Sequence, residues 1–245
     1  MIDQVKIETM DIQIVTLENP LSQCAAAVVI DVCRAFTTAA FAFNAGAAAV
    51  IMTDTVENAQ CLNAAYPGSL VMGEVGGQRV PGFDLWNSPS EIHKLDLSGK
   101  TIIQRTSAGT QGMVLYKDKV PLLAGSFVIA EATLKFLEAA SPETLALVAT
   151  GVRNGIGGTE DIALAEYMSE RLKGRQVSPN SYLEKASSWV GSAHGRNDET
   201  TRILQSDLAL CLDVDRFKFA LLVEQANNQL ILKAVNPDGS PADIK

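Results

Sequence analysis

The sequence predicts an α/β fold of three layers, α/β/α, with a mixed, mostly parallel sheet and a C-terminal antiparallel hairpin. Short runs rich in Val and Ile alternate with longer helical stretches over the first 175 residues, as in consecutive βαβ units. Runs such as Ala25–Asp31 and Leu145–Thr150 are apolar on both faces, which is typical of central strands covered by helices on both sides. A chain of 245 residues, 47% of them hydrophobic, can bury a core of this size.

The individual elements follow in order. We expect strands at Ile12–Leu17, Ala26–Asp31, Ala48–Thr53, Leu70–Gly73, Thr101–Arg105, Val120–Ala124 and Leu145–Thr150. Helices are expected at Arg34–Asn44, Val56–Ala65, Thr110–Lys117, Phe127–Ala140 and Glu160–Lys173. The uncharged stretch Ala35–Thr53 approaches the ~20 residues that span a bilayer. Its alanines, threonines and Asn44-Ala45-Gly46 helix end indicate instead a buried helix that runs into a buried strand.

The last third of the chain has a different pattern. Pro179–Leu212 is expected to be helical with polar insertions. Phe219–Glu224 and Leu230–Val235 are expected to pair as a hairpin across Gln225–Gln229, which makes the sheet mixed. No low-complexity linker interrupts the sequence, so we interpret residues 1–245 as one domain. It comprises a βα core (1–175) and a helical segment with the hairpin (176–245).

Composition limits the partners and the compartment. With 28 acidic residues against 20 Lys and Arg, the net charge is −8, and basic runs are missing. Such a chain is a poor candidate for binding nucleic acid or an anionic membrane. Its four cysteines form no CxxC and no zinc-binding spacing, and the first ten residues, with Asp3, Lys6 and Glu8, do not resemble a signal peptide. We expect a cytoplasmic protein, and the apolar content permits a homodimer.

Polar residues recur at the carboxyl ends of the predicted strands, where ligands bind in open α/β sheets. They are Asp31, Arg34, Glu74, Arg105, Thr106, Ser107, Gly109, Thr110, Ser126 and Arg153, followed by a Gly-rich turn with Glu160 and Asp161. Backbone N–H groups at helix starts, together with arginines, bind phosphoryl, sulfonate or carboxylate groups. Two carboxylates beside such an anion indicate a bridging Mg²⁺. Two other interpretations stay open: Asp31 as a helix N-cap, and the arginines as surface ion pairs.

Val75–Ile92 is longer than most connections in a compact domain, and loops of this length are usually functional or disordered. It contains Gly76, Gly77, Gly82, Pro81 and Pro89, which favour turns. It also contains Phe83, Leu85 and Trp86, which argue against disorder. We therefore expect a functional loop at the site.

Five blocks in this order resemble the 2-phosphosulfolactate phosphatase family over roughly residues 10–170. The blocks are 28–38 (VVIDVCRAFTT), 73–74 with 82–89 (GE and GFDLWNSP), 99–110 (GKTII and RTSAGT), 125–126 (GS) and the Gly-rich turn with Glu160-Asp161. The resemblance implies an α/β/α phosphatase that requires Mg²⁺. It would hydrolyse 2-phosphosulfolactate to sulfolactate and phosphate on the route to coenzyme M.

The resemblance also implies roles for individual residues. Asp31, Arg34 and Glu74 would be catalytic, and Asp31, Glu74, Asp84 and Asp161 would hold the metal ion. The small anionic phosphorylated substrate would contact Asn87, Ser88, Arg105, Thr106, Ser107, Gly109, Thr110, Ser126 and Arg153. We expect the Val75–Ile92 loop to close over the site, with Phe83 and Trp86 excluding water or anchoring the loop to the core.

Several positions depart from the family pattern. Arg105 and Ala108 stand where the family has a threonine and an asparagine, and Trp86 replaces a glycine. Ile129 replaces an asparagine and Cys33 a leucine. Two alternatives therefore stay open: a phosphatase for a different small phosphorylated carboxylic or sulfonic acid, and a non-catalytic binder of anionic metabolites.

Overall fold

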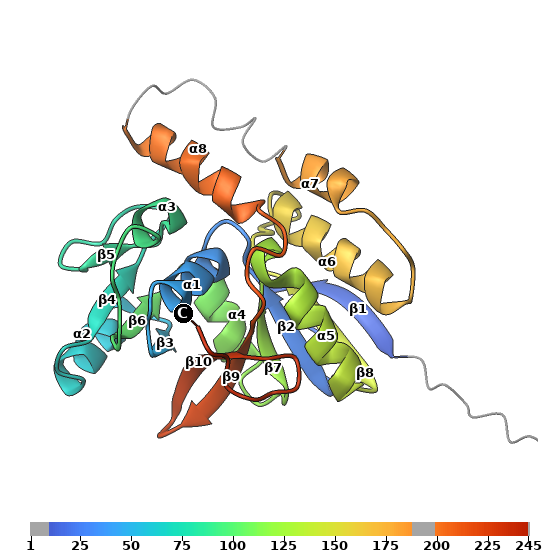
Figure 1. Ribbon diagram of the computed structural model, residues 1–245, viewed down its shortest axis with the longest axis horizontal. Helices are drawn as coiled ribbons and strands as arrows, with labels where there is room; N and C mark the ends of the chain where they lie inside the picture. Colours follow the sequence, from blue (N-terminus) through green and yellow to red (C-terminus); the bar gives the residue numbers. More distant parts are fainter. Residues whose placement is uncertain (1–9, 188–198, 245) are drawn as a thin grey trace, which may run out of the picture.

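The computed structural model describes residues 10–187 and 199–244. Ten strands form one mixed sheet, in the spatial order β1-β8-β2-β7-β9-β10-β3-β6-β4-β5 (Figure 1). The strands are β1 (Asp11–Thr16), β2 (Ala26–Ile30), β3 (Ala49–Thr53), β4 (Leu70–Gly73), β5 (Leu85–Trp86), β6 (Thr101–Arg105), β7 (Leu122–Gly125), β8 (Thr144–Ala149), β9 (Ala220–Ala226) and β10 (Gln229–Val235). Every predicted strand is present, and the predicted α/β class with a mixed, mostly parallel sheet is confirmed.

The helices alternate with these strands as predicted. They are α1 (Ala35–Asn44), α2 (Val56–Ala65), α3 (Pro89–Ile92), α4 (Gly109–Leu115), the 3₁₀ turn η1 (Phe127–Ile129), α5 (Ala130–Ala140), α6 (Thr159–Leu172), α7 (Asn180–Ser187) and α8 (Glu199–Cys211). Local chemistry explains their limits. Thr55 caps α2, because its side-chain oxygen accepts a hydrogen bond from the Asn58 backbone N–H at 3.1 Å.

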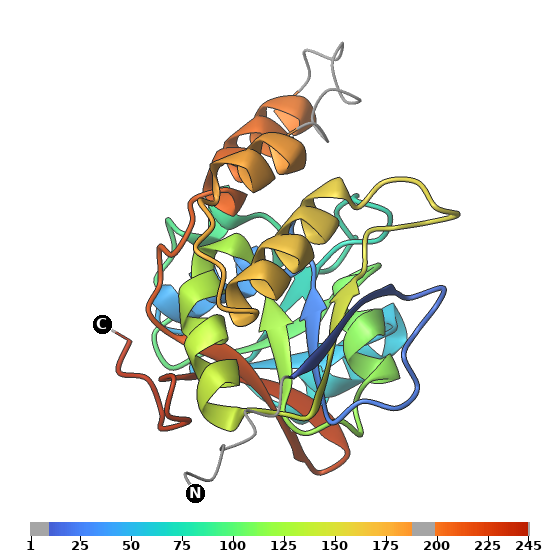
Figure 2. The same ribbon diagram turned by 90° about the vertical axis from the view of Figure 1, so that its right-hand side faces the viewer.

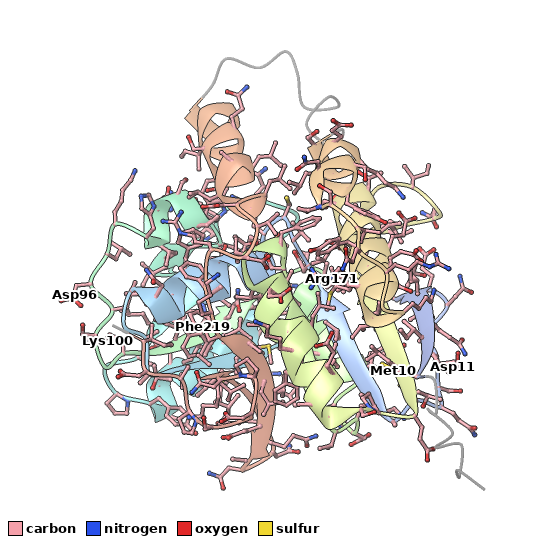
Figure 3. All side chains as sticks on the ribbon, turned by 45° about the vertical axis from the view of Figure 1, so that its right-hand side comes forward. Met10, Asp11, Asp96, Lys100, Arg171 and Phe219 are labelled. Atoms are coloured by element: carbon pink, nitrogen blue, oxygen red, sulfur yellow. The ribbon has the colours of Figure 1, made fainter. Side chains whose placement is uncertain are left out.

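The hairpin β9–β10 lies in the middle of the sheet. It joins a parallel group of four strands, β1, β8, β2 and β7, to a second parallel group, β3, β6, β4 and β5. The sheet crosses the whole molecule: Asp11 of β1 lies at one flank, Asp96 and Lys100 before β6 lie at the other, and Phe219 before β9 lies between them (Figure 3). Residues from the last quarter of the chain therefore complete the core that the first part begins.

Helices cover both faces of this sheet, which gives the three predicted layers. On one face, the buried helix α1 and Met113 of α4 pack against Val29 of β2, Val50 of β3 and neighbouring strand residues. On the other face, α5 and α6 cover β2, β7 and β8 (Figure 2), and α2 covers β3, β4 and β6. Arg171 in the last turn of α6 forms an ion pair with Glu131 of α5 at 2.6 Å (Figure 3).

Three details differ from the predicted elements. The strand predicted from Val120 begins at Leu122, since Pro121 has no N–H to donate to the sheet and Val120 is 82% exposed. The loop Val75–Ile92 contains the short elements β5 and α3. The predicted helical stretch 179–212 contains α7 and α8, and positions 188–198 between them lie outside the described residues.

A separate prediction concerned the membrane. None of the described helices combines the length and the hydropathy that crossing a bilayer requires. The uncharged stretch Ala35–Thr53 accordingly forms α1 and the buried strand β3, as predicted.

Candidate functional site

A cavity of about 400 Å³ lies where loops from both parallel groups meet. Of the predicted site residues, it is lined by Asp31, Arg34, Glu74, Asn87, Ser107 and Arg153. These side chains follow β2, β4, β5, β6 and β8, so the carboxyl ends of strands from both groups contribute to one cavity. This arrangement concentrates carboxylates, guanidinium groups and a hydroxyl around one hollow.

Asp31 connects the starts of two helices at this cavity. Its Oδ1 accepts a hydrogen bond from the Ala35 N–H of α1 at 2.9 Å, and its Oδ2 accepts one from the Gly109 N–H of α4 at 2.8 Å. The side chain is 7% exposed. Burial, followed by repulsion from Glu74, raises the pKa of Asp31 to about 6 despite these two hydrogen bonds. Asp31 thus acts as a helix cap and also presents a carboxylate to the cavity.

Glu74 holds two loops together on the opposite wall. Its Oε1 accepts a hydrogen bond from the Ser107 N–H at 2.5 Å, and its Oε2 accepts from the Gly77 N–H at 2.5 Å and the Ser107 hydroxyl at 3.1 Å. The Gly76 N–H in turn donates to the Ser107 Oγ at 2.9 Å. The turn Val75–Gln78 and the loop after β6 are therefore fixed relative to each other by one carboxylate.

Arg34 enters the cavity with its guanidinium group held from two sides. Its Nη1 donates to Asp207 Oδ2 of α8 at 2.7 Å, and both side chains are buried. The guanidinium carbon lies 4.4 Å from the ring centroid of Trp86, which is a stacking distance for a cation–π contact. Arg79 lies over the same indole at 4.7 Å. Trp86, which replaces a glycine of the family pattern, therefore packs against the guanidinium groups of two arginines, and we call it the Trp86 platform.

Other predicted substrate-binding residues lie close by but do not line the cavity. Arg105 donates to the backbone carbonyls of Asp54 at 3.2 Å and Glu74 at 2.7 Å. Thr106 and Thr110 hydrogen-bond to each other at the start of α4, and both are buried. These three side chains therefore hydrogen-bond to other groups of the protein around the site instead of facing the cavity.

Two predicted substrate-binding serines, Ser88 and Ser126, also hydrogen-bond to other side chains of the protein and do not line the cavity. Ser88 is fully buried and donates from its Oγ to Asp207 Oδ1 at 2.7 Å. Ser126 lies 2.5 Å from the Thr37 hydroxyl, measured between the two oxygens, and is also buried. Phe83, in the long loop, packs against the cluster of Ile51, Val71 and Ile103 and so anchors the loop to the core.

The remaining predicted carboxylates lie in two different places. Asp161 is buried behind the cavity wall, where it accepts hydrogen bonds from the Val32 and Gly151 N–H groups, both at 2.8 Å. Asp84 is exposed, does not line the cavity, and accepts a hydrogen bond from the Val71 N–H at 2.8 Å. Within residues 10–187 and 199–244, no three His, Cys, Asp or Glu side chains form a ready-made metal site.

The close contact at Gly109 gives a testable prediction. A Cβ there would lie 2.9 Å from Asp31 Oδ2 and 2.9 Å from the Ala35 Cβ, so α4 would have to shift away from Asp31. We expect Gly109→Ala to lower the free energy of unfolding by about 1–3 kcal/mol. We also expect it to lower any catalytic turnover in the cavity by about 10- to 100-fold, because the cavity wall moves with α4.

The matched control for this change is Gly99→Ala, measured by thermal unfolding and by kinetics. Gly99 has φ +69° and open space around its Cβ position, so alanine there introduces backbone strain of about 1 kcal/mol and no clash. Its activity should equal that of the unmodified chain. Unchanged activity in Gly109→Ala would show that the contact between α4 and Asp31 is dispensable.

Comparison with known proteins places these features in a family. The family model described as 2-phosphosulpholactate phosphatase matches residues 14–226. The chain belongs to this family.

Two similar proteins, from Thermotoga petrophila and Thermotoga maritima, are each named "Probable 2-phosphosulfolactate phosphatase". They are 34% and 33% identical to this chain over 205 residues, which is 80% of this chain and 88% of each relative. A protein of the same name from Carboxydothermus hydrogenoformans is 43% identical over 112 residues, 46% of each chain. The resemblance drawn from the five sequence blocks is confirmed, and the match extends beyond them into the hairpin.

Two buried carboxylates near the site of this 2-phosphosulpholactate phosphatase family member were assigned no catalytic, substrate-binding or metal-binding role from the sequence. Glu160, 4% exposed, has a buried Oε2 with no hydrogen-bond partner, and burial together with the Asp31 charge raises its pKa to about 7. Its position beside Asp161 in a Gly-rich turn was the available signal. The second residue is Asp207, the partner of Arg34. No motif marked Asp207, since α8 lies in the part of the sequence with the weakest resemblance.

Proposed function

We propose that this protein is a phosphoric monoester hydrolase that cleaves 2-phosphosulfolactate to sulfolactate and inorganic phosphate. One observation carries the proposal: Asp31, Glu74, Arg34, Ser107 and Arg153 meet around a single cavity in a member of this phosphatase family. Water supplies the oxygen that replaces the sulfolactate oxygen on phosphorus, and a proton passes to the leaving alkoxide. The cavity offers cationic and hydrogen-bonding groups for both anionic ends of such a substrate.

The cavity residues divide into two roles in this proposal. Arg34 and Arg153 both line the cavity and bind the anionic groups of the substrate. The Arg153 guanidinium group also donates to the backbone carbonyls of Thr150 at 3.1 Å and Ser107 at 3.3 Å, which hold it at the cavity wall. Asn87 and Ser107 supply hydrogen bonds, and Asn87 is 3% exposed, so its amide is held in place by the surrounding core. These groups orient the phosphoryl group and stabilise its charge, which is the main contribution of protein side chains to phosphoryl transfer.

We further propose that the site requires Mg²⁺. Burial raises the pKa of Asp31, Glu160 and Asp161. Repulsion from Asp31 raises the pKa of Glu160 further, and repulsion from both Glu160 and Asp31 raises that of Asp161. Glu160 Oε2 is a buried acceptor without a hydrogen-bond partner, and a divalent cation in the neighbouring cavity would offset the negative charge gathered there. Mg²⁺ commonly uses only one or two carboxylates with water and phosphate oxygens, and Asp31 and Glu74, which line the cavity, would serve. The ion would supply charge neutralisation at the phosphoryl oxygens.

The departures from the family pattern bear on the alternative substrates. Arg105 donates to backbone carbonyls instead of lining the cavity, and Ile129 is fully buried in the core. Of the substituted positions, Cys33 and Ala108 line the cavity. A changed substrate would therefore have to depend on these two small side chains or on the Trp86 platform. This placement favours the substrate of the family over a different phosphorylated acid.

Phosphate release tests the proposal. We expect the purified chain to release inorganic phosphate from 2-phosphosulfolactate in the presence of Mg²⁺, and chelation with EDTA to abolish the release. A panel of phosphorylated carboxylic acids, such as phosphoglycerate and phospholactate, serves as the comparison. Release from a panel member alone would replace the substrate. Ligand-induced thermal stabilisation without release from any compound would support the non-catalytic binder and overturn the proposed activity.

A further inference from the structure

We propose that Asp207 is a positioning residue of the active site, which orients the guanidinium group of Arg34 toward the cavity. The inference rests on the proposed function for its kinetic consequence, but the geometry that it describes is independent of catalysis. Asp207 lies on α8, at the upper side of the molecule above α1 and α3 (Figure 1). It is 1% exposed and does not line the cavity.

Both carboxylate oxygens of Asp207 are used at the site. Oδ2 accepts from Arg34 Nη1 at 2.7 Å, while Oδ1 accepts from the Ser88 hydroxyl at 2.7 Å and the Ser90 N–H at 3.0 Å. Ser88 and Ser90 lie at the start of α3, in the long loop that borders the cavity. One side chain therefore links α8, α3 and the loop after β2.

The stacking on Trp86 leaves Arg34 one free direction of rotation, and Asp207 blocks it. An indole restrains a guanidinium group to its face but permits rotation within that plane. The hydrogen bond from Nη1 to Asp207 fixes the orientation in the plane and directs the remaining N–H groups. Arg34 lines the cavity and is only 7% exposed, so a rotated guanidinium group has little water to replace the lost partner. A carboxylate that served only to attach α8 would need Ser88 and Ser90 but not Arg34.

Kinetics separate the two roles of Asp207. Asp207→Asn keeps an oxygen that accepts from Ser88 and Ser90 and removes the negative charge that holds Arg34. We expect it to lower kcat/KM by about 10- to 100-fold, whereas in an Arg34→Gln background it should lower kcat/KM less than about threefold, because the two residues act as a unit. Asp207→Glu, which restores the charge, should recover part of the loss. The matched control is Asp213→Asn, which breaks the exposed ion pair of Asp213 with Arg216 and should leave kcat/KM unchanged.

Fluorescence tests the geometry without any substrate. The chain has two tryptophans, and Trp189→Phe leaves Trp86, against which Arg34 lies, as the only tryptophan; excitation at a wavelength that tyrosine does not absorb then reports on Trp86 alone. In that background, Arg34→Gln should shift the emission maximum or intensity, Asp207→Asn should shift it in the same direction, and the double variant should shift it no further. Asp213→Asn should leave the emission unchanged.

The outcomes distinguish the failure of this inference from the failure of the proposed function. If Arg34→Gln and Asp207→Asn shift the emission as described but the chain releases no phosphate from any compound, the positioning role stands and the proposed activity is rejected. Equal losses of kcat/KM from Asp207→Asn in the wild-type and Arg34→Gln backgrounds would overturn the positioning role. The positioning role would also be overturned if Asp207→Asn left the emission of the Trp189→Phe protein unchanged, because Arg34 would then keep its place without Asp207.

Discussion

Replacing Asp31 with Asn should reduce kcat by about 10³-fold or more while the fold is retained. The lost charge is the cavity carboxylate that we assign to the metal ion, and it lies between the starts of α1 and α4. Asparagine accepts only one of the two backbone hydrogen bonds, which costs about 1–3 kcal/mol. At neutral pH it also removes a buried charge whose pKa, raised from 3.8 to about 6, destabilises the fold by about 3 kcal/mol. These effects offset each other.

Thermal unfolding and steady-state kinetics at pH 7.5 check this result together. Asp96→Asn is the control: Asp96 accepts two hydrogen bonds from Ser98 on the exposed surface and does not line the cavity. It should retain wild-type kcat. Full turnover by Asp31→Asn would remove Asp31 from the catalytic set and leave it as a helix cap. A collapse of the far-ultraviolet circular dichroism would show that the cap dominates its role.

The second large effect is a loss of stability with rising pH. The folded-state pKa values of Asp31, about 6, and Glu160, about 7, lie above the ordinary 3.8 and 4.5. The folded protein therefore holds more protons than the unfolded chain between about pH 4 and 7. Because the free energy of unfolding falls wherever the folded state binds more protons, these two groups should lower it by about 3 to 6 kcal/mol across this window. Chemical denaturation in EDTA at several pH values measures the slope.

Mg²⁺ should oppose this loss. A cation bound by ionised carboxylates competes with protons, so it should stabilise the fold more at pH 8 than at pH 5. At a concentration of 100 times the dissociation constant, the stabilisation is about 2.7 kcal/mol. Ca²⁺ and K⁺ at the same ionic strength separate specific binding from screening. An equal effect of Mg²⁺ at both pH values would contradict a carboxylate site for the ion.

Glu160→Gln isolates one contributor to the pH effect. It removes a buried acid whose Oε2 has no hydrogen-bond partner, so the variant should be more stable than the wild type at pH 8 and nearly equal to it at pH 4. The Asp161 carboxyl should then titrate at lower pH, because repulsion from Glu160 raises its pKa in the wild type. If the free energy of unfolding of Glu160→Gln changes with pH between 5 and 7 as steeply as that of the wild type, Glu160 does not contribute to the pH effect.

The local order of the fold could be predicted from the sequence, because strand and helix periodicity are properties of short segments. Helix α2 was predicted at its observed limits, and β4 and β6 also match. Strand ends directed attention to Asp31 and Glu74, and both line the cavity. The short elements β5 and α3 were missed, since two- and four-residue segments carry no measurable period.

The direction of each polar side chain could not be predicted in the same way. Arg34 lies just after β2 and Arg105 is the last residue of β6, yet Arg34 lines the cavity and Arg105 donates to backbone carbonyls. The choice depends on neighbours far away in the chain. Arg34 has Asp207 and Trp86, and Arg105 has the carbonyl groups of Asp54 and Glu74.

By itself, the sequence determined the strands, the helices and the set of residues at the strand ends, because these follow from local composition and spacing. Only the tertiary structure decided how they meet. Three antiparallel pairings separate β7 from β3, so the two parallel groups run in opposite directions along the sheet. Residues that follow strands of both groups nevertheless line one cavity. Asp31 Oδ2 accepts a hydrogen bond from the Gly109 N–H at 2.8 Å, although the two residues lie 78 positions apart in the chain. Local periodicity cannot specify such a contact, because it depends on how distant elements pack together.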